Sequence, residues 1–153
     1  MSSAVRVKRT GSLLASDVRT ARSIWARFRG LMGRRSLAPG EGLWLPTDAS
    51  IHMLFMRFAI DAVFLAPAED GWPASAAPPG EPGTTSQSRA RLIGRARPEP
   101  TAWRVVAIRE RLRPWIGVVW FVRGARGCLE LEAGAATRAG LRVGDVVRFE
   151  PGA

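Results

Sequence analysis

Hydrophobic and polar positions alternate near both ends of the chain, and this alternation predicts half-buried β-strands. Near the N-terminus, Val5 and Val7 face away from Arg6 and Lys8. Residues 147–149 repeat the same period of two near the C-terminus. Each end of the chain is therefore expected to contribute one strand to a sheet.

The middle of the chain contains further strand-like segments. Aromatic and β-branched residues, which favour strands, are concentrated at 42–45, 51–65 and 103–111. The sequence Arg113-Pro114-Trp115 is expected to end the last of these strands, because proline removes a backbone donor.

The segment 128–132 alternates again. Leu129 and Leu131 are predicted to point into the core, and Glu130 is predicted to leave it on the opposite face. A short helix of small residues is expected to follow over 133–139, closed by a glycine.

One longer helix is predicted in the first third of the chain. Thr20 is a suitable N-cap, Ile24, Phe28 and Leu31 recur at helical spacing, and Gly33 stands where a C-terminal cap belongs. The expected fold is mainly β (α+β), with a small barrel-like or strongly curved antiparallel sheet, one flanking helix and one short helix.

The composition changes abruptly between residues 67 and 101. This stretch holds seven of the chain's 11 prolines, mixed with alanine, glycine, serine and arginine. Such a segment buries little apolar area, so we expect a disordered insert. The 153 residues suit one domain over 1–153, which this insert interrupts.

Hydropathy and cysteine content limit the class of protein. The longest apolar run, 116–122, is too short to cross a bilayer, and no secretory signal is expected, so we predict a cytoplasmic protein without membrane insertion. A single Cys128 and a single His52 cannot build a disulfide or a structural zinc site. No metal or other cofactor is predicted.

The formal net charge of +10 suggests an anionic partner. Nine basic residues lie in 1–35 and eight in 71–115, whereas 36–70 carries one basic residue and five acidic ones. No nucleic-acid-binding motif accompanies the charge, so any nucleic-acid binding is expected to be non-specific. An acidic protein or a small anionic ligand is the other expected partner.

Four motifs together resemble a known family. They are GLMGR at 30–34, SIHMLFMRFAIDAVF at 50–64, CLELEAG at 128–134 and AGLRVGDVV at 139–147. In order and spacing they resemble domain-of-unknown-function family 192. The resemblance implies a compact bacterial or archaeal β-barrel with a flanking helix and with no assigned reaction.

The chain departs from that family's commonest pattern after the aromatic-Met-basic sequence, which is Phe55-Met56-Arg57 here. An Asn-Thr pair is usual there, followed by Pro-Leu-Asp, whereas this chain reads FMRFAID at 55–61. Any role of the Asn-Thr pair therefore does not transfer. Arg57 and Asp61 match the pattern.

Candidate catalytic residues gather in one segment. His52 could act as a general base, Asp61 could orient it, and Arg57 could hold an anionic substrate. On a regular strand, however, His52 and Arg57 would face opposite sides. The alternative interpretation, which we favour, is that Arg57 and Asp61 pair across a turn and His52 bonds to the backbone at the barrel rim.

Other candidate ligand-binding residues have structural alternatives too. Ser50 lacks the glycine-flanked elbow of a nucleophile. Arg27 and Arg34 could clamp an anion, or could lie on a solvated face or reach Glu41 or Asp48. Glu130 is expected to be outside the core, and Asp145 after Gly144 is expected to cap backbone N–H groups of a tight turn.

Three functional hypotheses remain open. The leading one is an accessory or small-ligand-binding β-barrel domain without catalysis. The second is an enzyme that acts on a small anionic substrate through His52, Arg57 and Asp61. The third is weak binding of nucleic acid or an acidic partner through the basic helix and the insert.

Overall fold

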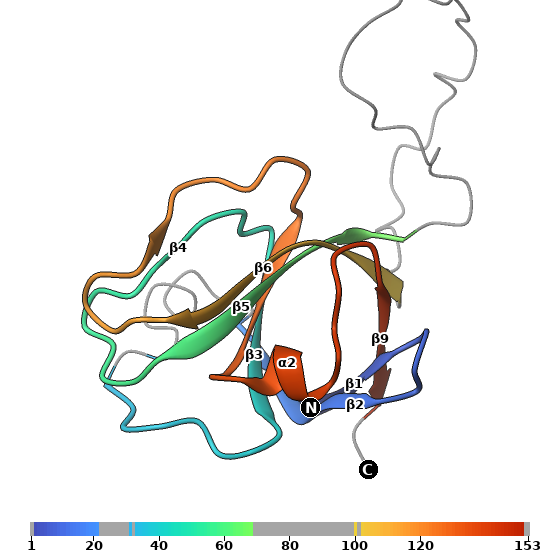
Figure 1. Cartoon of the computed structure of the whole chain (residues 1–153), viewed down its shortest axis with the longest axis horizontal. Coiled ribbons are helices and arrows are strands. Elements are labelled where there is room, and N and C mark those ends of the chain that lie inside the picture. The colour runs from blue at the N-terminus through green and yellow to red at the C-terminus, as the bar shows by residue number, and fades with distance from the viewer. Residues whose placement is uncertain (1, 22–30, 32, 69–99, 101, 152–153) are drawn as a thin grey trace, which may run out of the picture.

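The computed structural model describes residues 2–21, 31, 33–68, 100 and 102–151, and these residues form a closed seven-stranded β-barrel beside a small two-stranded sheet (Figure 1). The predicted mainly-β fold is confirmed. The barrel strands are β1 (Ser2–Val7), β2 (Leu13–Thr20), β3 (Glu41–Pro46), β5 (Ile60–Pro67), β6 (Ala102–Leu112), β8 (Gly127–Glu132) and β9 (Val146–Pro151); the small sheet is β4 (Ile51–His52) with β7 (Val118–Val119), and the short helix is α2 (Ala135–Arg138).

The barrel strands follow the order β1-β2-β3-β8-β5-β6-β9, and pairing between β1 and β9 closes the ring. All neighbouring pairs are antiparallel except β2 with β3, which run parallel. The predicted antiparallel arrangement is wrong at this one pair. The connection over residues 21–40 is long enough for the crossover that a parallel pair requires.

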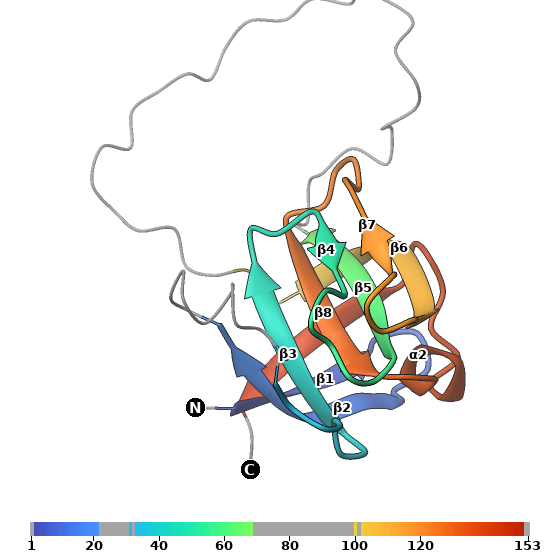
Figure 2. The same cartoon turned by 90° about the vertical axis from the view of Figure 1, so that its left-hand side faces the viewer.

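Two apolar layers explain the burial of the strands. The first layer draws on all seven barrel strands and so fills the barrel interior, where Val63 and Leu129 are fully buried. The second lies on the outer face of β3, β8, β5 and β6, where Phe64 and Cys128 are fully buried beneath Ile51 of β4. Figure 2 shows these four strands in that order across the face that β4 and β7 cover.

The second layer corrects the prediction for Glu130. The alternation placed this residue on the face opposite Leu129 and Leu131, and it does lie there. That face does not contact solvent, however, because the second apolar layer covers it. Glu130 is therefore only 5% exposed. A strand buried on both faces loses the solvent side that an alternating pattern normally indicates.

A cluster of aromatic rings fills one part of the barrel interior. The ring centroids of Trp44 and Trp103 lie 4.7 Å apart at an interplanar angle of 66°, and Phe149 lies 5.2 Å from Trp44. Gly127 lies beneath the Trp44 ring, so closely that an added Cβ would be 2.1 Å from a ring carbon. Glycine is therefore required at this position.

Several boundaries differ from those predicted. Strand β2 was not predicted, because its sequence LLASDVRT does not alternate apolar and polar residues, and its burial pattern likewise lacks a period of two. The expected strand over 51–65 is divided into β4 and β5 by a non-strand segment. The short helix predicted over 133–139 is present as α2.

The longer helix predicted from Thr20 to Gly33 falls largely outside the described residues; Thr20 itself ends β2. Within the described residues, no helix is long and apolar enough to cross a membrane.

The two strands that flank the proline-rich insert are adjacent. Pro67 at the end of β5 lies opposite Trp103 of β6, and the N–H of Ala68 donates to the carbonyl of Ala102 at 3.0 Å. The barrel is thus continuous across the start and the end of the insert.

Candidate functional site

The structure does not bring His52, Arg57 and Asp61 together. His52 is exposed on β4 and Arg57 is exposed between β4 and β5, whereas Asp61 is fully buried in β5. Within the described part of the chain, no hydrogen bond or ion pair joins any two of these side chains. The enzyme hypothesis thus has no assembled acid–base pair to support it.

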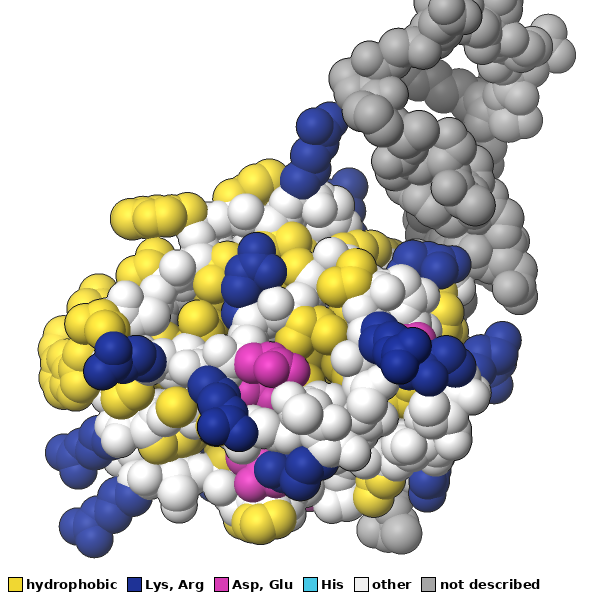
Figure 3. Space-filling view, in the orientation of Figure 1, with side chains coloured by type: hydrophobic (Ala, Val, Ile, Leu, Met, Phe, Trp, Pro, Cys, Tyr) yellow, Lys and Arg dark blue, Asp and Glu magenta, His cyan; other side chains and the backbone are white. Residues whose placement is uncertain are grey.

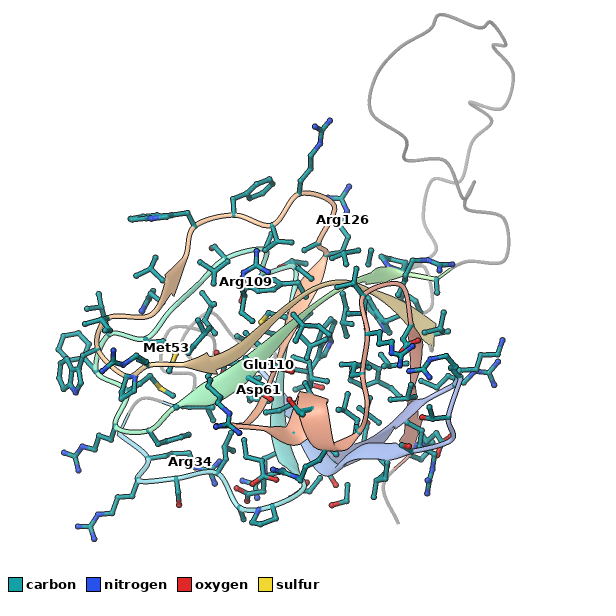
Figure 4. All side chains as sticks on the ribbon, viewed as in Figure 1. Arg34, Met53, Asp61, Arg109, Glu110 and Arg126 are labelled. Carbon is teal, nitrogen blue, oxygen red and sulfur yellow. The ribbon has the colours of Figure 1, made fainter. Side chains whose placement is uncertain are left out.

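Asp61 is held by backbone groups instead. Its Oδ1 accepts a hydrogen bond from the N–H of Arg111 at 2.8 Å, and its Oδ2 accepts from Gly134 at 3.0 Å and from Ala136 at 3.1 Å. The carboxylate therefore fastens β6 and the start of α2 to β5, beside α2 in Figure 4. The expected contact with turn N–H groups is confirmed, but the predicted pair with Arg57 is wrong, because Asp61 is fully buried whereas Arg57 is exposed and forms no ion pair with it.

The structure describes only one of the two arginines of the predicted anion clamp. Arg34 forms an ion pair with Glu41 at 3.4 Å, as the structural alternative predicted, and Arg27 lies outside the described residues. Ser50 is exposed and makes no hydrogen bond to another described residue.

Asp145 joins the turn before β9 to the turn that follows β1. It accepts from the N–H of Arg142 at 2.9 Å, which confirms the predicted turn, and it forms two hydrogen bonds with the guanidinium of Arg9, at 2.7 and 3.0 Å. Arg9 also donates to the carbonyl of Gly140 at 2.8 Å. The hydrogen bonds from Arg9 are the largest cause that lowers the pKa of Asp145. The residue has a structural role in linking three turns.

Glu130 is a buried acid in the second apolar layer. Its Oε2 has no hydrogen-bond partner among the described residues. Burial raises the pKa of Glu130 to about 8, and the charge of Asp48 adds to the shift. Burial also raises the pKa of the neighbouring Cys128 thiol, with smaller contributions from these two acids. Both shifts favour the protonated, uncharged form of these side chains.

A surface cavity of about 270 Å³ lies between β2, the turn at 39–40 and α2. Its two charged lining residues, Glu132 and Arg138, form an ion pair with each other. The remaining lining is made of small or apolar side chains and serines. An anionic ligand would have to compete with Glu132 for Arg138, so this cavity offers no free charge.

The most distinctive surface is a group of exposed apolar side chains, which we call the aromatic tip. It contains seven of the nine large hydrophobic residues that are exposed in the described part of the chain. Figure 3 shows hydrophobic side chains gathered along the left edge and upper left of the molecule, over the end that carries β4 in Figure 1. The tip consists of Leu54, Phe55, Trp115, Ile116, Val118, Trp120 and Phe121.

Backbone hydrogen bonds around Met53 join the two segments that carry the tip. The N–H of Met53 donates to the carbonyl of Gly117 at 2.8 Å, and the Met53 carbonyl accepts from Trp115 at 2.9 Å and from Met56 at 3.1 Å. Met53 itself is fully buried, and an added Cβ on Gly117 would lie 2.7 Å from its side chain. Figure 4 places Met53 at this end of the molecule.

Two aromatic residues of the tip adopt left-handed backbone conformations. Phe55 has φ 64° and Trp115 has φ 68°, and their rings meet edge to face with centroids 5.5 Å apart. Such a conformation is unfavourable for a bulky residue and persists only where the surroundings impose it. The fold therefore holds both rings in exposed positions at some cost in stability.

Four exposed arginines accompany the tip. They are Arg57, Arg113, Arg123 and Arg126, and none belongs to an ion pair among the described residues. The tip segments 49–58 and 113–126 contain no acidic residue. This end of the molecule thus combines exposed hydrophobic area with a positive charge.

Fold and surface together define a small closed β-barrel with an exposed aromatic tip and a basic surround. The chain belongs to the DUF192 family: the family model, described as Uncharacterized ACR, matches residues 5–89. This match confirms the family resemblance. The matched range includes the first two of the four motifs, at 30–34 and 50–64.

Two solved structures share the fold. One is described as a "putative transcription regulator" from Sinorhizobium meliloti; it is 20% identical, with a TM-score of 0.67 over 97% of this chain and 94% of that one. The other is a protein of unknown function from Novosphingobium aromaticivorans, which is 21% identical, with a TM-score of 0.64 over 95% and 83%. No curated protein matches the chain.

The aromatic tip was not foreseen from the sequence, where the run 116–122 is notable only for being too short to span a bilayer. A signal was nevertheless present. Trp120 and Phe121 are consecutive, so on an extended backbone they point in opposite directions and a one-sided core cannot bury both.

Proposed function

We propose that this chain is a non-catalytic binding domain, in which the barrel is a rigid scaffold and the aromatic tip attaches it to an anionic macromolecular surface. One observation carries the proposal: seven of the nine large exposed hydrophobics in the described residues belong to the tip. Contiguous exposed apolar side chains usually mark an interaction site.

The charge of the partner follows from the arginines. Arg57, Arg113, Arg123 and Arg126 are exposed at or beside the tip, without an acidic residue in either tip segment. Complementary charge steers a partner towards the surface, and the apolar side chains then supply contact area. An anionic surface suits both features.

The proposal can be tested by measuring binding of the full chain to a panel of anionic surfaces: phosphatidylglycerol vesicles, single-stranded DNA and polyglutamate. We expect salt-sensitive binding to one of them, and we expect Trp120→Ser with Phe121→Ser to weaken it strongly. Both side chains are exposed, by 86% and 72%, so the barrel should remain folded. Binding that survives these substitutions would contradict the assignment to the tip.

A control variant tests whether the loss of any exposed hydrophobic side chain weakens binding, or only the loss of side chains in the tip. Val143 is 63% exposed and lies in the turn before β9, outside the tip. Val143→Ser should leave binding to every surface of the panel unchanged, and thermal unfolding would verify that all variants fold.

Three further properties of the protein remain proposals. A single domain interrupted by a disordered insert at 67–101 is supported by the composition of that segment and by the pairing of β5 with β6 on either side of it. A cytoplasmic location is supported by a single, buried and unpaired cysteine. A bacterial origin is supported by the family.

A further inference from the structure

We infer that the anionic surface is the headgroup region of a lipid bilayer, onto which the aromatic tip docks peripherally. The inference rests on the proposed function and adds the identity of the partner. It requires no membrane-spanning segment, because the side chains of the tip enter only the boundary between headgroups and acyl chains.

The composition of the tip favours lipid over nucleic acid. Leu54, Ile116 and Val118 are 47%, 66% and 42% exposed. Aliphatic side chains cannot stack on bases as aromatic rings do, but they partition from water into hydrocarbon. Tryptophan prefers the membrane interface, where its apolar ring and its polar N–H are both accommodated.

The shape of the tip favours a soft partner over a rigid protein. Trp120 and Phe121 are neighbours in the chain, and both stand clear of their own protein at 86% and 72% exposure. A folded partner would need a groove matched to both rings and to the edge-to-face pair of Phe55 with Trp115. A fluid bilayer surrounds such a convex surface without preformed complementarity.

Part of the backbone that carries the tip is already paired within the protein, which suits an apolar environment. Unpaired N–H and carbonyl groups are costly away from water. Here the N–H groups of Met53, Trp115 and Gly117 all donate to carbonyls within the two tip segments, and the N–H of Val122 donates to the carbonyl of Ala49. The exposed side chains can therefore leave water without taking unpaired donors from these positions with them.

The arginines account for a preference for anionic lipid. Arg113 precedes the apolar run and Arg123 follows it, so positive charges flank the part that would enter the bilayer. Basic side chains next to an anionic leaflet strengthen attachment, and salt screens this contribution.

The first experiment is co-sedimentation of the full chain with phosphatidylcholine vesicles, with and without phosphatidylglycerol. We expect binding to the anionic vesicles that salt weakens, and a decrease of about tenfold or more for Trp120→Ser with Phe121→Ser. Val143→Ser should bind as the wild type does.

A charge-matched pair of variants tests the arginines. Arg123→Ala with Arg126→Ala should weaken binding to anionic vesicles several-fold. Arg104→Ala with Arg148→Ala removes the same net charge from exposed positions on β6 and β9, and it should change binding much less. Equal losses in the two double variants would overturn the docking geometry.

Tryptophan fluorescence gives a second readout. Trp115 and Trp120 should move to a less polar environment on binding, so emission should shift to the blue with anionic vesicles. Replacing both residues by phenylalanine should abolish most of that shift while vesicle binding persists. A full shift in that variant would place the bound surface elsewhere and overturn the inference.

The possible outcomes distinguish a failure of the lipid inference from a failure of the proposed binding function. If tip-dependent binding is found for single-stranded DNA or polyglutamate and not for vesicles, the lipid inference fails and the binding function of the tip stands. If no anionic surface binds in a tip-dependent way, both fail.

Discussion

Among single residues, Asp61 shows how a group that looks catalytic in sequence can serve the fold. Its carboxylate is fully buried and accepts three backbone N–H groups from β6 and from the start of α2. A buried carboxylate with three donors is stable because each donor replaces a water molecule that folding removes.

Asp61→Asn is therefore expected to destabilise the barrel by about 2 to 4 kcal/mol, because an amide NH₂ would face a backbone N–H in place of an acceptor oxygen. Chemical denaturation curves of the variant and the wild type would measure the loss. His52→Ala at an exposed position should change stability by less than about 0.5 kcal/mol. A fully stable Asp61→Asn protein would show that these hydrogen bonds contribute nothing.

The titration of Glu130 should make the stability of the barrel depend on pH. Its pKa is about 8 in the folded barrel, against an ordinary value of 4.5. Between these pH values the folded state keeps a proton that the unfolded state has released. The free energy of unfolding should therefore fall as pH rises through this window, by about 3 to 5 kcal/mol in total.

Glu130→Gln removes the titrating group with little change of shape. Its free energy of unfolding should be nearly independent of pH over the window, and it should exceed that of the wild type near pH 8. Glu150→Gln is the control, because Glu150 is exposed and should leave the slope unchanged. The assignment is wrong if Glu130→Gln keeps the slope of the wild type.

At the scale of elements, the β3–β8 pair depends on one close approach. Gly127 at the start of β8 lies against the ring of Trp44 from β3, which in turn packs on Trp103 and Phe149. An alanine methyl group at this position would overlap the ring, and the surrounding rings leave little room for it to move.

Gly127→Ala should destabilise the barrel by about 3 kcal/mol, as expected for overpacking in a closed core. Gly124→Ala is the comparison: nothing lies within 4 Å of the Cβ that the substitution would add, but the φ of Gly124 is +83°. That backbone strain should cost about 1 kcal/mol. Thermal and denaturant unfolding of the two variants would separate overlap from strain, and equal losses would refute the role assigned to the Trp44 contact.

For the whole molecule, the insert separates two sequence blocks that form one barrel. Pro67 and Trp103 are register partners, and the two strands remain paired beyond them through Ala68 and Ala102. The chain can therefore pass from β5 to β6 by a hairpin turn, without the intervening sequence.

Replacing residues 69–99 with a short Gly/Ser turn should leave the thermal midpoint within a few degrees, because loop closure depends only weakly on length. A Gly/Ser loop of native length serves as the control for length. A large loss of stability in both variants would show that the native insert packs on the barrel, contrary to the prediction of a disordered segment.

The sequence by itself determined the elements whose patterns are local. Val5 and Val7 indicated the first strand, Asp145 indicated its turn, and four spaced motifs indicated the family. Alternation and turn chemistry depend on neighbours in the chain, so they can be recognised without the fold.

Only the tertiary structure decided which faces meet water. Glu130 alternates like a surface residue, yet a second layer buries it, whereas Trp120 and Phe121 belong to an apolar run and remain exposed. Both results depend on residues distant in sequence, since β4 and β7 cover one face of the barrel and leave the tip uncovered. Burial is a property of packed surfaces, and a local pattern cannot specify what packs against it.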